Sequence, residues 1–296
     1  MECKRSSTKD SWTGLDGDIQ KEPGDVGLNL QRDIRAVYKN LEDDFMEVLF
    51  PHFTSMTLLP GLLSLASILL LFCGDAKTID FESLSTEDEK NQQEIVDKHN
   101  GLRAQASPPA SNMLKMEWLQ EAQKTAQIWA ETCSFKHSDQ KDRTIESVCG
   151  ENLYMSTAPT TWSGAIQSWY DEVLHFKFEK GSTSGEAVGH YTQVMWYNSY
   201  QVGCGVAKCP NSYFKYFFVC HYCPAGNVLP KQNSPYEIGT PCSKCPDSCS
   251  NNLCNNPCKY SNDYGNCDDL KKQVTCQHPI VHKHCKASCQ CTNKIY

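Results

Sequence analysis

The chain has 296 residues, a net charge of −7 and 18 cysteines. Residues 77–296 are close to neutral, with 21 Lys and Arg against 23 Asp and Glu, so most of the acidic excess belongs to the first quarter of the chain. No segment has the dense positive charge of a nucleic-acid-binding protein, and that class of function is excluded.

Ten of the cysteines crowd into residues 242–291. Thiols at this density either bind metal or pair as disulfides. The gaps that follow Cys258 are eight, eight, eight, three and one residues long, which fits no tetrahedral zinc ligand set. We therefore predict a disulfide scaffold that forms in an oxidising compartment.

The start of the chain carries a candidate secretion signal, but not at residue 1. Residues 1–55 are polar and acidic, and an apolar run of about fifteen residues follows Met56 and ends at the small residues 73–76. This length is typical of a signal peptide and too short for a membrane span. We predict a signal peptide over 56–76, with 1–55 as a disordered or alternative-start extension. A signal anchor with a cytosolic tail is the competing hypothesis.

The next segments predict an α+β domain. Residues 77–90 form an acidic lead-in, and residues 91–225 combine apolar periodicity with aromatic residues. Three stretches have apolar residues at helical spacing, and two later stretches have the composition or alternation of strands. The helical stretches begin near Ile95, Leu119 and Trp162, and the strands begin near Gln201 and Tyr213. A domain of this length can bury a core.

The end of the chain has a different composition. Residues 226–257 begin with prolines and polar amides and then hold four cysteines, which predicts a linker and a hinge. Residues 258–296 have too few large aliphatic side chains to fold by burial alone. Because each disulfide would contribute about 2–4 kcal/mol, we predict a small domain that its disulfides hold together.

Four segments are similar to the signature motifs of the CAP superfamily: His99–Arg103, Cys149–Leu153, Gly189–Trp196 and His221–Asn227. Together with the ten trailing cysteines, they make the chain resemble a mammalian cysteine-rich secretory protein over residues 91–296. The resemblance implies an α-β-α sandwich CAP domain, then a hinge, then a small disulfide-rich helical domain like that of a toxin.

The resemblance also implies how the cysteines pair, which their spacing alone leaves open. Three of the implied pairs lie in the CAP domain, two in the hinge and three in the last domain. In that order they are Cys133–Cys209, Cys149–Cys223, Cys204–Cys220, Cys242–Cys249, Cys245–Cys254, Cys258–Cys291, Cys267–Cys285 and Cys276–Cys289.

Two histidines and two glutamates of the family's CAP cleft fall here on His137, Glu151, Glu172 and His190. Imidazole and carboxylate ligands suit zinc, and the same groups can act as general acid and base. The alternative is a hydrogen-bonded polar cluster that only orders the cleft. The resemblance supplies most of the support for zinc as a cofactor, and the function that we predict does not require it.

The sequence lacks familiar hydrolase motifs. It has neither the His-Glu-x-x-His helix of a metalloprotease nor a Gly-x-Ser-x-Gly elbow. Ser138, beside His137, and Ser168, one turn before Glu172, stand in no strained turn pattern, so neither is expected to be a nucleophile. We predict a protein that is not an enzyme; protease activity, suggested within the wider superfamily, is a minority hypothesis.

The last domain resembles cnidarian potassium-channel toxins in its six-cysteine order. Those toxins place a Lys-Tyr pair between the third and fourth cysteines, where this chain has Lys283 without a neighbouring tyrosine. Direct potassium-channel block is therefore in doubt. The family's regulation of calcium-permeable, cyclic-nucleotide-gated or ryanodine-receptor channels still implies an ion-channel partner. The candidate channel-binding lysines are Lys271, Lys272 and Lys283, and the expected surface histidines are His278, His282 and His284.

Adhesion and lipid carriage are two further hypotheses. Mammalian relatives coat sperm or occur in exocrine and neutrophil-granule secretions. This implies a secreted protein, which a secretory or acrosomal granule could also hold. It also implies a sperm or egg membrane surface as partner. Residues 217–228 match the region tied to gamete interaction, although Phe217, Phe218 and Tyr222 are expected to fill the core of a sheet. Superfamily members also bind sterols, for which this sequence has no local pattern.

Overall fold

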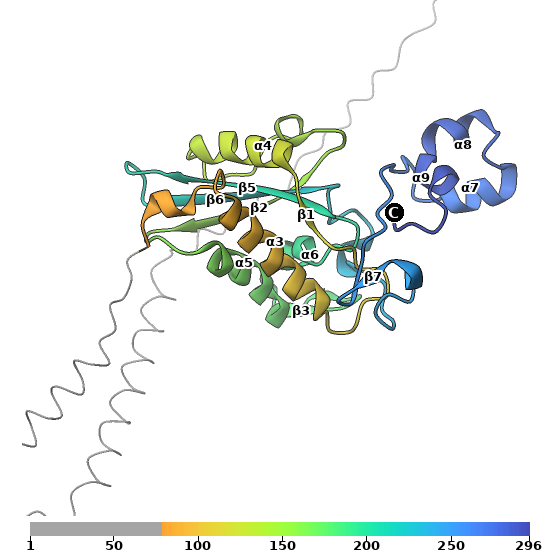
Figure 1. Cartoon of the computed structure of the whole chain (residues 1–296), viewed down its shortest axis with the longest axis horizontal. Helices are drawn as coiled ribbons and strands as arrows, with labels where there is room; N and C mark the ends of the chain where they lie inside the picture. The colour runs from red at the N-terminus through yellow and green to blue at the C-terminus, as the bar shows by residue number, and fades with distance from the viewer. Residues whose placement is uncertain (1–78) are drawn as a thin grey trace, which may run out of the picture. The chain divides into compact units, whose positions relative to one another are not determined.

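The central element is a four-stranded sheet in the order β1-β5-β6-β2 (Figure 1). The computed structural model describes residues 79–296, so the extension 1–55 and the signal peptide 56–76 lie outside the described residues. Strand β6 pairs antiparallel with both β5 and β2, and β1 pairs parallel with β5. The strands are β1 Glu117–Trp118, β2 Gly150–Ser156, β5 Gln201–Lys208 and β6 Tyr216–Cys223.

Both faces of this sheet are buried. Most residues of β5 and β6 are buried, and their side chains alternate between the two faces. Phe218 packs in one core cluster with Trp162, whereas its neighbour Phe217 packs in another cluster with Ala126. Phe217, Phe218 and Tyr222 are fully buried, which confirms the prediction that they fill the core of the sheet.

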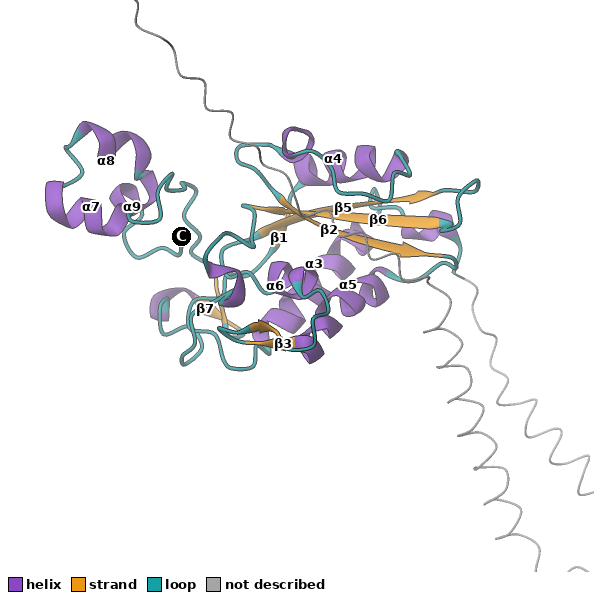
Figure 2. Cartoon of the chain, turned by 180° about the vertical axis from the view of Figure 1, so that it is seen from behind, coloured by secondary structure: helices purple, strands orange, loops and turns teal. Residues whose placement is uncertain are grey.

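Helices cover the two faces of the sheet. Helix α4 lies on one face, and α3, α5 and α6 lie on the other (Figure 2). The helices are α3 Glu89–Ala104, α4 Gln120–Glu131, α5 Trp162–Asp171 and α6 Gly189–Val194. The three stretches of helical periodicity correspond to α3, α4 and α5, and the layers form the expected α-β-α sandwich.

Helix α4 approaches β5 closely because two glycines of the strand have no side chain. A Cβ atom on Gly203 would lie 2.1 Å from the backbone N of Gln123, and a Cβ atom on Gly205 would lie 2.4 Å from Cα of Gln127. Gln127 also binds both backbone groups of Val206. Its Oε1 accepts from the N–H at 3.0 Å and its Nε2 donates to the carbonyl at 3.2 Å. This contact requires glycine at both positions.

The acidic lead-in packs against the domain that it precedes. Its single-turn helix η1 (Phe81–Leu84) buries Leu84, whose carbonyl accepts from Nε1 of Trp162 at 2.9 Å. Asp88 then caps α3, since its carboxylate accepts from the backbone N–H of Lys90 at 2.9 Å. The other short elements of the CAP domain are η2 Gln140–Arg143, η3 Glu172–His175, β3 Phe176–Lys177 and β4 Gly181–Ser182.

The segment after β6 is docked, although its composition predicts a linker. Tyr236 is 3% exposed, and the carbonyl of Pro235 accepts from the backbone N–H of Tyr197 at 2.8 Å. The carbonyl of Glu237 accepts from the backbone N–H of Ser111 at 2.8 Å. One buried aromatic ring and these paired backbone groups hold a segment that is otherwise poor in apolar residues. The hinge contains η4 Lys231–Asn233, η5 Pro246–Ser248, β7 Cys249–Ser250 and β8 Leu253–Cys254.

The last domain consists of three short helices, α7 Cys267–Val274, α8 Pro279–His284 and α9 Lys286–Gln290. Beside its cysteines, Val281 and Ala287 are the apolar side chains buried in its two clusters. The chain then returns to the CAP domain. Ile295 packs with Leu114 and hinge cysteines, and the hydroxyl of Tyr197 donates to a main-chain oxygen of Tyr296 at 2.8 Å.

Disulfides take the place of a large apolar core in the hinge and the last domain. The structure contains the same eight pairs that the family resemblance implies. They are Cys133–Cys209, Cys149–Cys223, Cys204–Cys220, Cys242–Cys249, Cys245–Cys254, Cys258–Cys291, Cys267–Cys285 and Cys276–Cys289.

Candidate functional site

The four residues considered as zinc ligands lie in two histidine–glutamate pairs. His137 Nδ1 lies 2.6 Å from Oε1 of Glu151, and His190 Nδ1 lies 2.6 Å from Oε1 of Glu172. Glu151 is on β2, His190 is on α6, Glu172 begins η3, and His137 is in the loop after α4. Both pairs adjoin β2, because Nδ2 of Asn152 donates to the carbonyl of His190 at 3.1 Å.

Glu151 is the buried member of the first pair. Its side chain is 1% exposed, whereas that of His137 is 61% exposed. Oε1 also accepts from the backbone N–H of Ser138 at 2.9 Å, and Oε2 accepts from Ser138 Oγ at 2.7 Å. Burial alone would raise the pKa of this carboxyl. The hydrogen bonds from His137, His221 and Ser138 outweigh burial and hold the pKa well below its usual range.

His221 is a member of this cluster that the sequence did not single out. It is fully buried on β6, directly opposite Glu151 on β2, and its Nε2 lies 3.0 Å from Oε2 of Glu151. Its Nδ1 lies 2.8 Å from Oγ1 of Thr125, so the ring is held from both sides. In the sequence, the one indication of this role was its place at the start of the fourth motif. The register of β2 and β6 is what shows that it faces Glu151.

Glu172 anchors the start of α6. Its Oε2 accepts from the backbone N–H groups of His190 and Tyr191 at 2.9 and 3.0 Å. These are donors that the first turn of a helix leaves without a partner inside the helix. The ring of His190 also stacks on Trp169, with ring centroids 6.4 Å apart. One carboxylate therefore positions both the helix and the imidazole of the second pair.

The imidazoles of His137 and His190 are the groups of this cluster that are suited to bind zinc. A carboxylate at Nδ1 leaves Nε2 of His137 and of His190 as the ring nitrogen that a metal ion could bind. Glu151 and Glu172 would then orient the rings and increase their basicity, as carboxylates beside metal-binding histidines do.

A closed ligand cage is not present in the part of the chain that the structure describes. There, one group of three His, Cys, Asp or Glu ligand atoms lies within 4.8 Å of one another, and it consists of Cys242, Cys245 and Cys254. All three of these cysteines are in disulfides. Water or a ligand from a partner would therefore complete the coordination of a zinc ion bound at either imidazole.

Two residues of the first motif serve the core instead. His99 is fully buried; its Nδ1 lies 2.7 Å from the carbonyl of Ile95 and its Nε2 lies 2.9 Å from the hydroxyl of Tyr222. Burial lowers the pKa of His99 to about 4. Burial also lowers the pKa of Arg103 to about 9, so its guanidinium stays charged at neutral pH. Arg103 donates to the carbonyls of Leu114, Val194, Trp196 and Tyr197.

The two serines weighed as nucleophiles have structural partners. Ser138 Oγ donates to Glu151 and accepts from Nη1 of Arg143 at 2.9 Å. Ser168 Oγ donates to the carbonyl of Gly164 at 3.2 Å. Neither hydroxyl has a histidine as its hydrogen-bond partner among residues 79–296, whereas a serine nucleophile needs an adjacent base.

The three candidate channel-binding lysines lie in different environments. Nζ of Lys271 donates to the carbonyl of Ser288 at 2.5 Å, which ties α7 to α9. Lys272 forms an exposed ion pair with Asp269 at 3.2 Å. Lys283 lines a groove of about 510 Å³ that includes other lysines of the last domain and CAP residues. Lys272 and Lys283 are therefore better placed than Lys271 to meet a partner.

The histidines of the last domain also differ from one another. His278 and His282 are exposed, as expected for surface histidines. Nδ1 of His284 lies 2.7 Å from Oδ2 of Asp263, and the His284 side chain is partly buried. His284 thus helps to fix the loop before α7.

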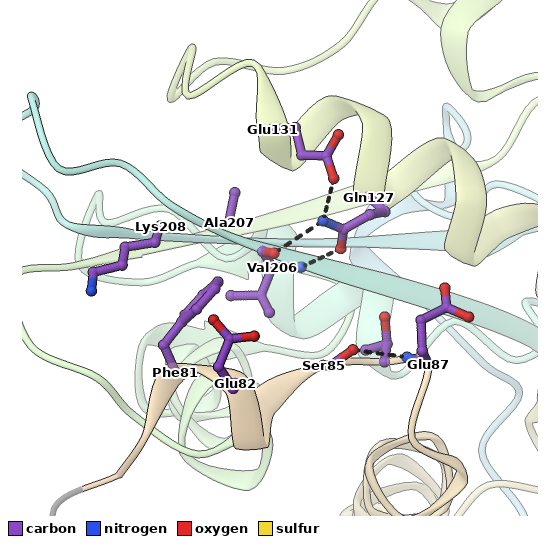
Figure 3. Close-up of a pocket in the computed structure, with 10 residues that line it drawn as sticks. Phe81, Glu82, Ser85, Glu87, Gln127, Glu131, Val206, Ala207 and Lys208 are labelled. Carbon is purple, nitrogen blue, oxygen red and sulfur yellow. Dashed lines mark hydrogen bonds between the residues drawn. The ribbon is translucent and has the colours of Figure 1, made fainter.

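A second cavity of about 480 Å³ lies beside α4 and β5 (Figure 3). Phe81, Val206 and Ala207 give it an apolar side, while Glu82, Glu87 and Glu131 are among its polar lining residues. The hydrogen bonds of Gln127 to Val206 cross its wall (Figure 3). Ionised carboxylates are costly to cover with an apolar molecule, so this lining does not favour a sterol.

None of the helices in residues 79–296 is both long and apolar enough to cross a membrane. The CAP sandwich, the hinge and the disulfide-rich helical domain together define a two-domain CAP protein. Residues 96–222 match a family model described as CAP, cysteine-rich secretory protein family, and residues 242–296 match a model described as Crisp. The chain belongs to the cysteine-rich secretory protein family.

Named relatives extend this result. Human cysteine-rich secretory protein 2 is 52% identical over 243 residues, which cover 81% of this chain and 100% of that protein. Human cysteine-rich secretory protein 3 is 53% identical over 245 residues, with the same coverage. The cysteine-rich venom protein helothermine of Heloderma horridum horridum is 49% identical over 243 residues, again with 81% of this chain and 100% of the relative covered.

Among solved structures, the crystal structure of NaASP2 with Zn2+ is 32% identical and has a TM-score of 0.47. The match covers 62% of this chain and 99% of that chain.

Proposed function

We propose that this protein is a secreted, non-enzymatic binding protein whose Cys-rich domain, residues 258–296, regulates an ion channel or docks on another cell-surface protein. The observation that carries the proposal is the surface of α7 and α8. Val274 and Ile280 are large apolar side chains left exposed on these helices, which also present exposed Lys272 and Lys283. Apolar side chains in solvent beside positive charge suit an acidic partner surface.

Secretion is supported by the relatives, which are named as secretory and venom proteins. It is also supported by eight disulfides in residues 133–291, since such cross-links persist in oxidising compartments. The absence of enzymatic activity is supported by the partners of Ser138 and Ser168. Cleavage of a peptide library by the purified protein, lost in His190→Ala, would overturn the non-enzymatic proposal.

The test of channel regulation uses the intact protein on a panel of cells that each express one channel. Patch-clamp currents are compared for wild type, the double variant Val274→Ser/Ile280→Ser and the double variant Lys272→Ala/Lys283→Ala. Both variants should lose the effect on current. Lys294→Ala, an exposed lysine outside α7 and α8, is the matched control and should keep it. Equal effects of all four proteins would reject this surface.

Adhesion to a sperm or egg surface is a second candidate function. The aromatic residues of 217–228 are buried, but Val228 and the next residue, Leu229, are exposed in the loop after β6. We therefore assign any adhesive contact to this loop rather than to the aromatic residues. Val228→Ser/Leu229→Ser should compete less well than wild type for binding to gametes, and unchanged competition would reject the loop.

A further inference from the structure

The hinge brings two disulfides into contact with each other. The bonds are Cys242–Cys249 and Cys245–Cys254. The Sγ atoms of Cys242, Cys245 and Cys254 all lie within 4.8 Å of one another. The sulfur of Cys242 is therefore a near neighbour of both sulfurs of the other disulfide, so a thiolate formed there would have a disulfide within reach.

The backbone allows a second way of pairing the same four cysteines. Cys249 and Cys254 are direct partners across the β7–β8 hairpin, which turns through Asn251 and Asn252 with φ of 52° and 64°. Positive φ at both central residues is typical of a tight two-residue turn. A bond between directly opposed strand residues already exists in this chain, since Cys204 and Cys220 are register partners on β5 and β6 and are bridged.

The other two cysteines are also close enough for a bond. Cys242 and Cys245 stand at the ends of a turn, which is closed by a hydrogen bond from the Cys245 N–H to the Cys242 carbonyl at 2.9 Å. The Cα atoms at the ends of such a turn lie within about 7 Å, which is the range that a disulfide can span with small adjustment. The alternative pairs are thus Cys242–Cys245 and Cys249–Cys254.

The exposure of these four cysteine residues is uneven. Cys242, Cys245 and Cys254 are buried, whereas Cys249 is exposed on β7. A thiol from solution therefore meets Cys249 first. Attack at Cys249 releases Cys242, which is the cysteine whose sulfur lies beside the second disulfide.

We infer that the hinge is a thiol–disulfide exchange site that takes a low-molecular-weight thiol at Cys249 and isomerises to the alternative pairing. The incoming thiolate attacks Sγ of Cys249, forms a mixed disulfide and releases the Cys242 thiolate. Cys242 then attacks Sγ of Cys245, forms the Cys242–Cys245 bond and releases the Cys254 thiolate. Cys254 attacks Sγ of Cys249, closes the hairpin and expels the original thiolate, so no net oxidation or reduction occurs.

The two pairings connect the hinge differently. The observed bonds join the 242–245 turn to the 249–254 hairpin, and the alternative bonds close each of them separately. The turn and the hairpin would then have no disulfide between them; the chain, their shared packing with Leu114 and Ile295, and separate hydrogen bonds to the CAP domain would remain. Those bonds run from the Lys244 N–H to the Ser111 carbonyl at 3.1 Å and from the Cys254 N–H to the Met113 carbonyl at 2.8 Å. Isomerisation would remove both covalent links between the turn and the hairpin.

The experiment follows the bonds in the intact protein after incubation with reduced glutathione at mildly alkaline pH. Free thiols are blocked with N-ethylmaleimide, and the protein is digested with trypsin and Asp-N. Cleavage after Lys244 and before Asp247 places Cys242 and Cys245 on two separate peptides. Cys249 and Cys254 fall on a third peptide, 247–259, which also carries Cys258 and its bond to the Cys291 peptide in both pairings. In the observed pairing the third peptide is joined to both others. In the alternative pairing the Cys242 and Cys245 peptides are joined to each other, which gives a new mass.

We expect this mass to appear at a rate that rises with glutathione, while the Cys204–Cys220 bond persists. Cys242→Ser/Cys249→Ser is the matched control; it keeps Cys245–Cys254 and should take up no glutathione in the hinge. The inference is overturned if the observed hinge bonds persist unchanged, if glutathione stays on Cys249 without a Cys242–Cys245 product, or if the bonds of the CAP domain reshuffle at the same rate.

Discussion

The buried imidazole of His99 makes the stability of the CAP domain depend on pH. Burial lowers its pKa to about 4, whereas an unfolded histidine titrates near about 6.5. Between these values the unfolded chain binds more protons than the folded one, so stability falls as the pH falls. The full shift corresponds to about 3 kcal/mol, and about 2 kcal/mol of it is lost by about pH 5.

The assay is guanidinium unfolding with the disulfides intact, followed by tryptophan fluorescence at several pH values between about 7.5 and about 5. Wild type should lose about 2 kcal/mol more than His99→Gln over this range, because the amide does not titrate. His282→Gln changes an exposed histidine and should keep the wild-type pH dependence. Equal pH dependence of wild type and His99→Gln would refute the assignment to this imidazole.

Three further outcomes follow from single contacts. Arg103→Met leaves the carbonyls of Leu114 and Val194 without a donor and removes one of two donors from those of Trp196 and Tyr197. It should lower the free energy of unfolding by about 2–6 kcal/mol in the same assay, and a loss under about 1 kcal/mol would contradict this. Gly205→Ala should cost about 1–3 kcal/mol through its contact with α4. Gly101→Ala is the control: it lies in α3 with nothing within 4 Å of the new Cβ, and it should raise the free energy of unfolding by about 0.5–1 kcal/mol. Equal effects of Gly205→Ala and Gly101→Ala would reject the close approach of α4 to β5. In titration calorimetry, wild type should bind zinc, and EDTA should reverse the binding. His190→Ala should lose this binding, and Glu172→Gln should weaken the affinity about 10–100-fold. Unchanged zinc affinity in His190→Ala would exclude His190 as a ligand.

Much of the sandwich could be predicted because its longer elements repeat apolar residues at a regular spacing. The periodicity near Ile95, Leu119 and Trp162 predicted α3, α4 and α5, and the late aromatic run predicted β6. Helix α6 was missed because six residues are too few to show a period. Its start is fixed by the carboxylate of Glu172, eighteen residues earlier, and local sequence does not reveal such a contact.

The residues of the site could be predicted only where they belong to a family motif or match the family's cleft. They supplied both histidine–glutamate pairs, but the role of His221 depends on the register of β2 and β6, which no local pattern determines. The lysines of the last domain show the same limit. From composition, Lys271 is expected to be a solvated surface charge. Its hydrogen bond to the carbonyl of Ser288 depends on the packing of α7 against α9, which the sequence does not show.

The last residues of the chain belong to the core of the hinge. Ile295 packs with Leu114 and three hinge cysteines, and Tyr296 accepts a hydrogen bond from Tyr197, so the end of the chain completes the core of the hinge. Deleting residues 258–296 would expose Leu114 and the hinge disulfides together with removing the channel-binding surface. A lost effect in that deletion would then have two causes. Point variants on α7 and α8 remove only side chains that face solvent, and they separate channel binding from the integrity of the hinge.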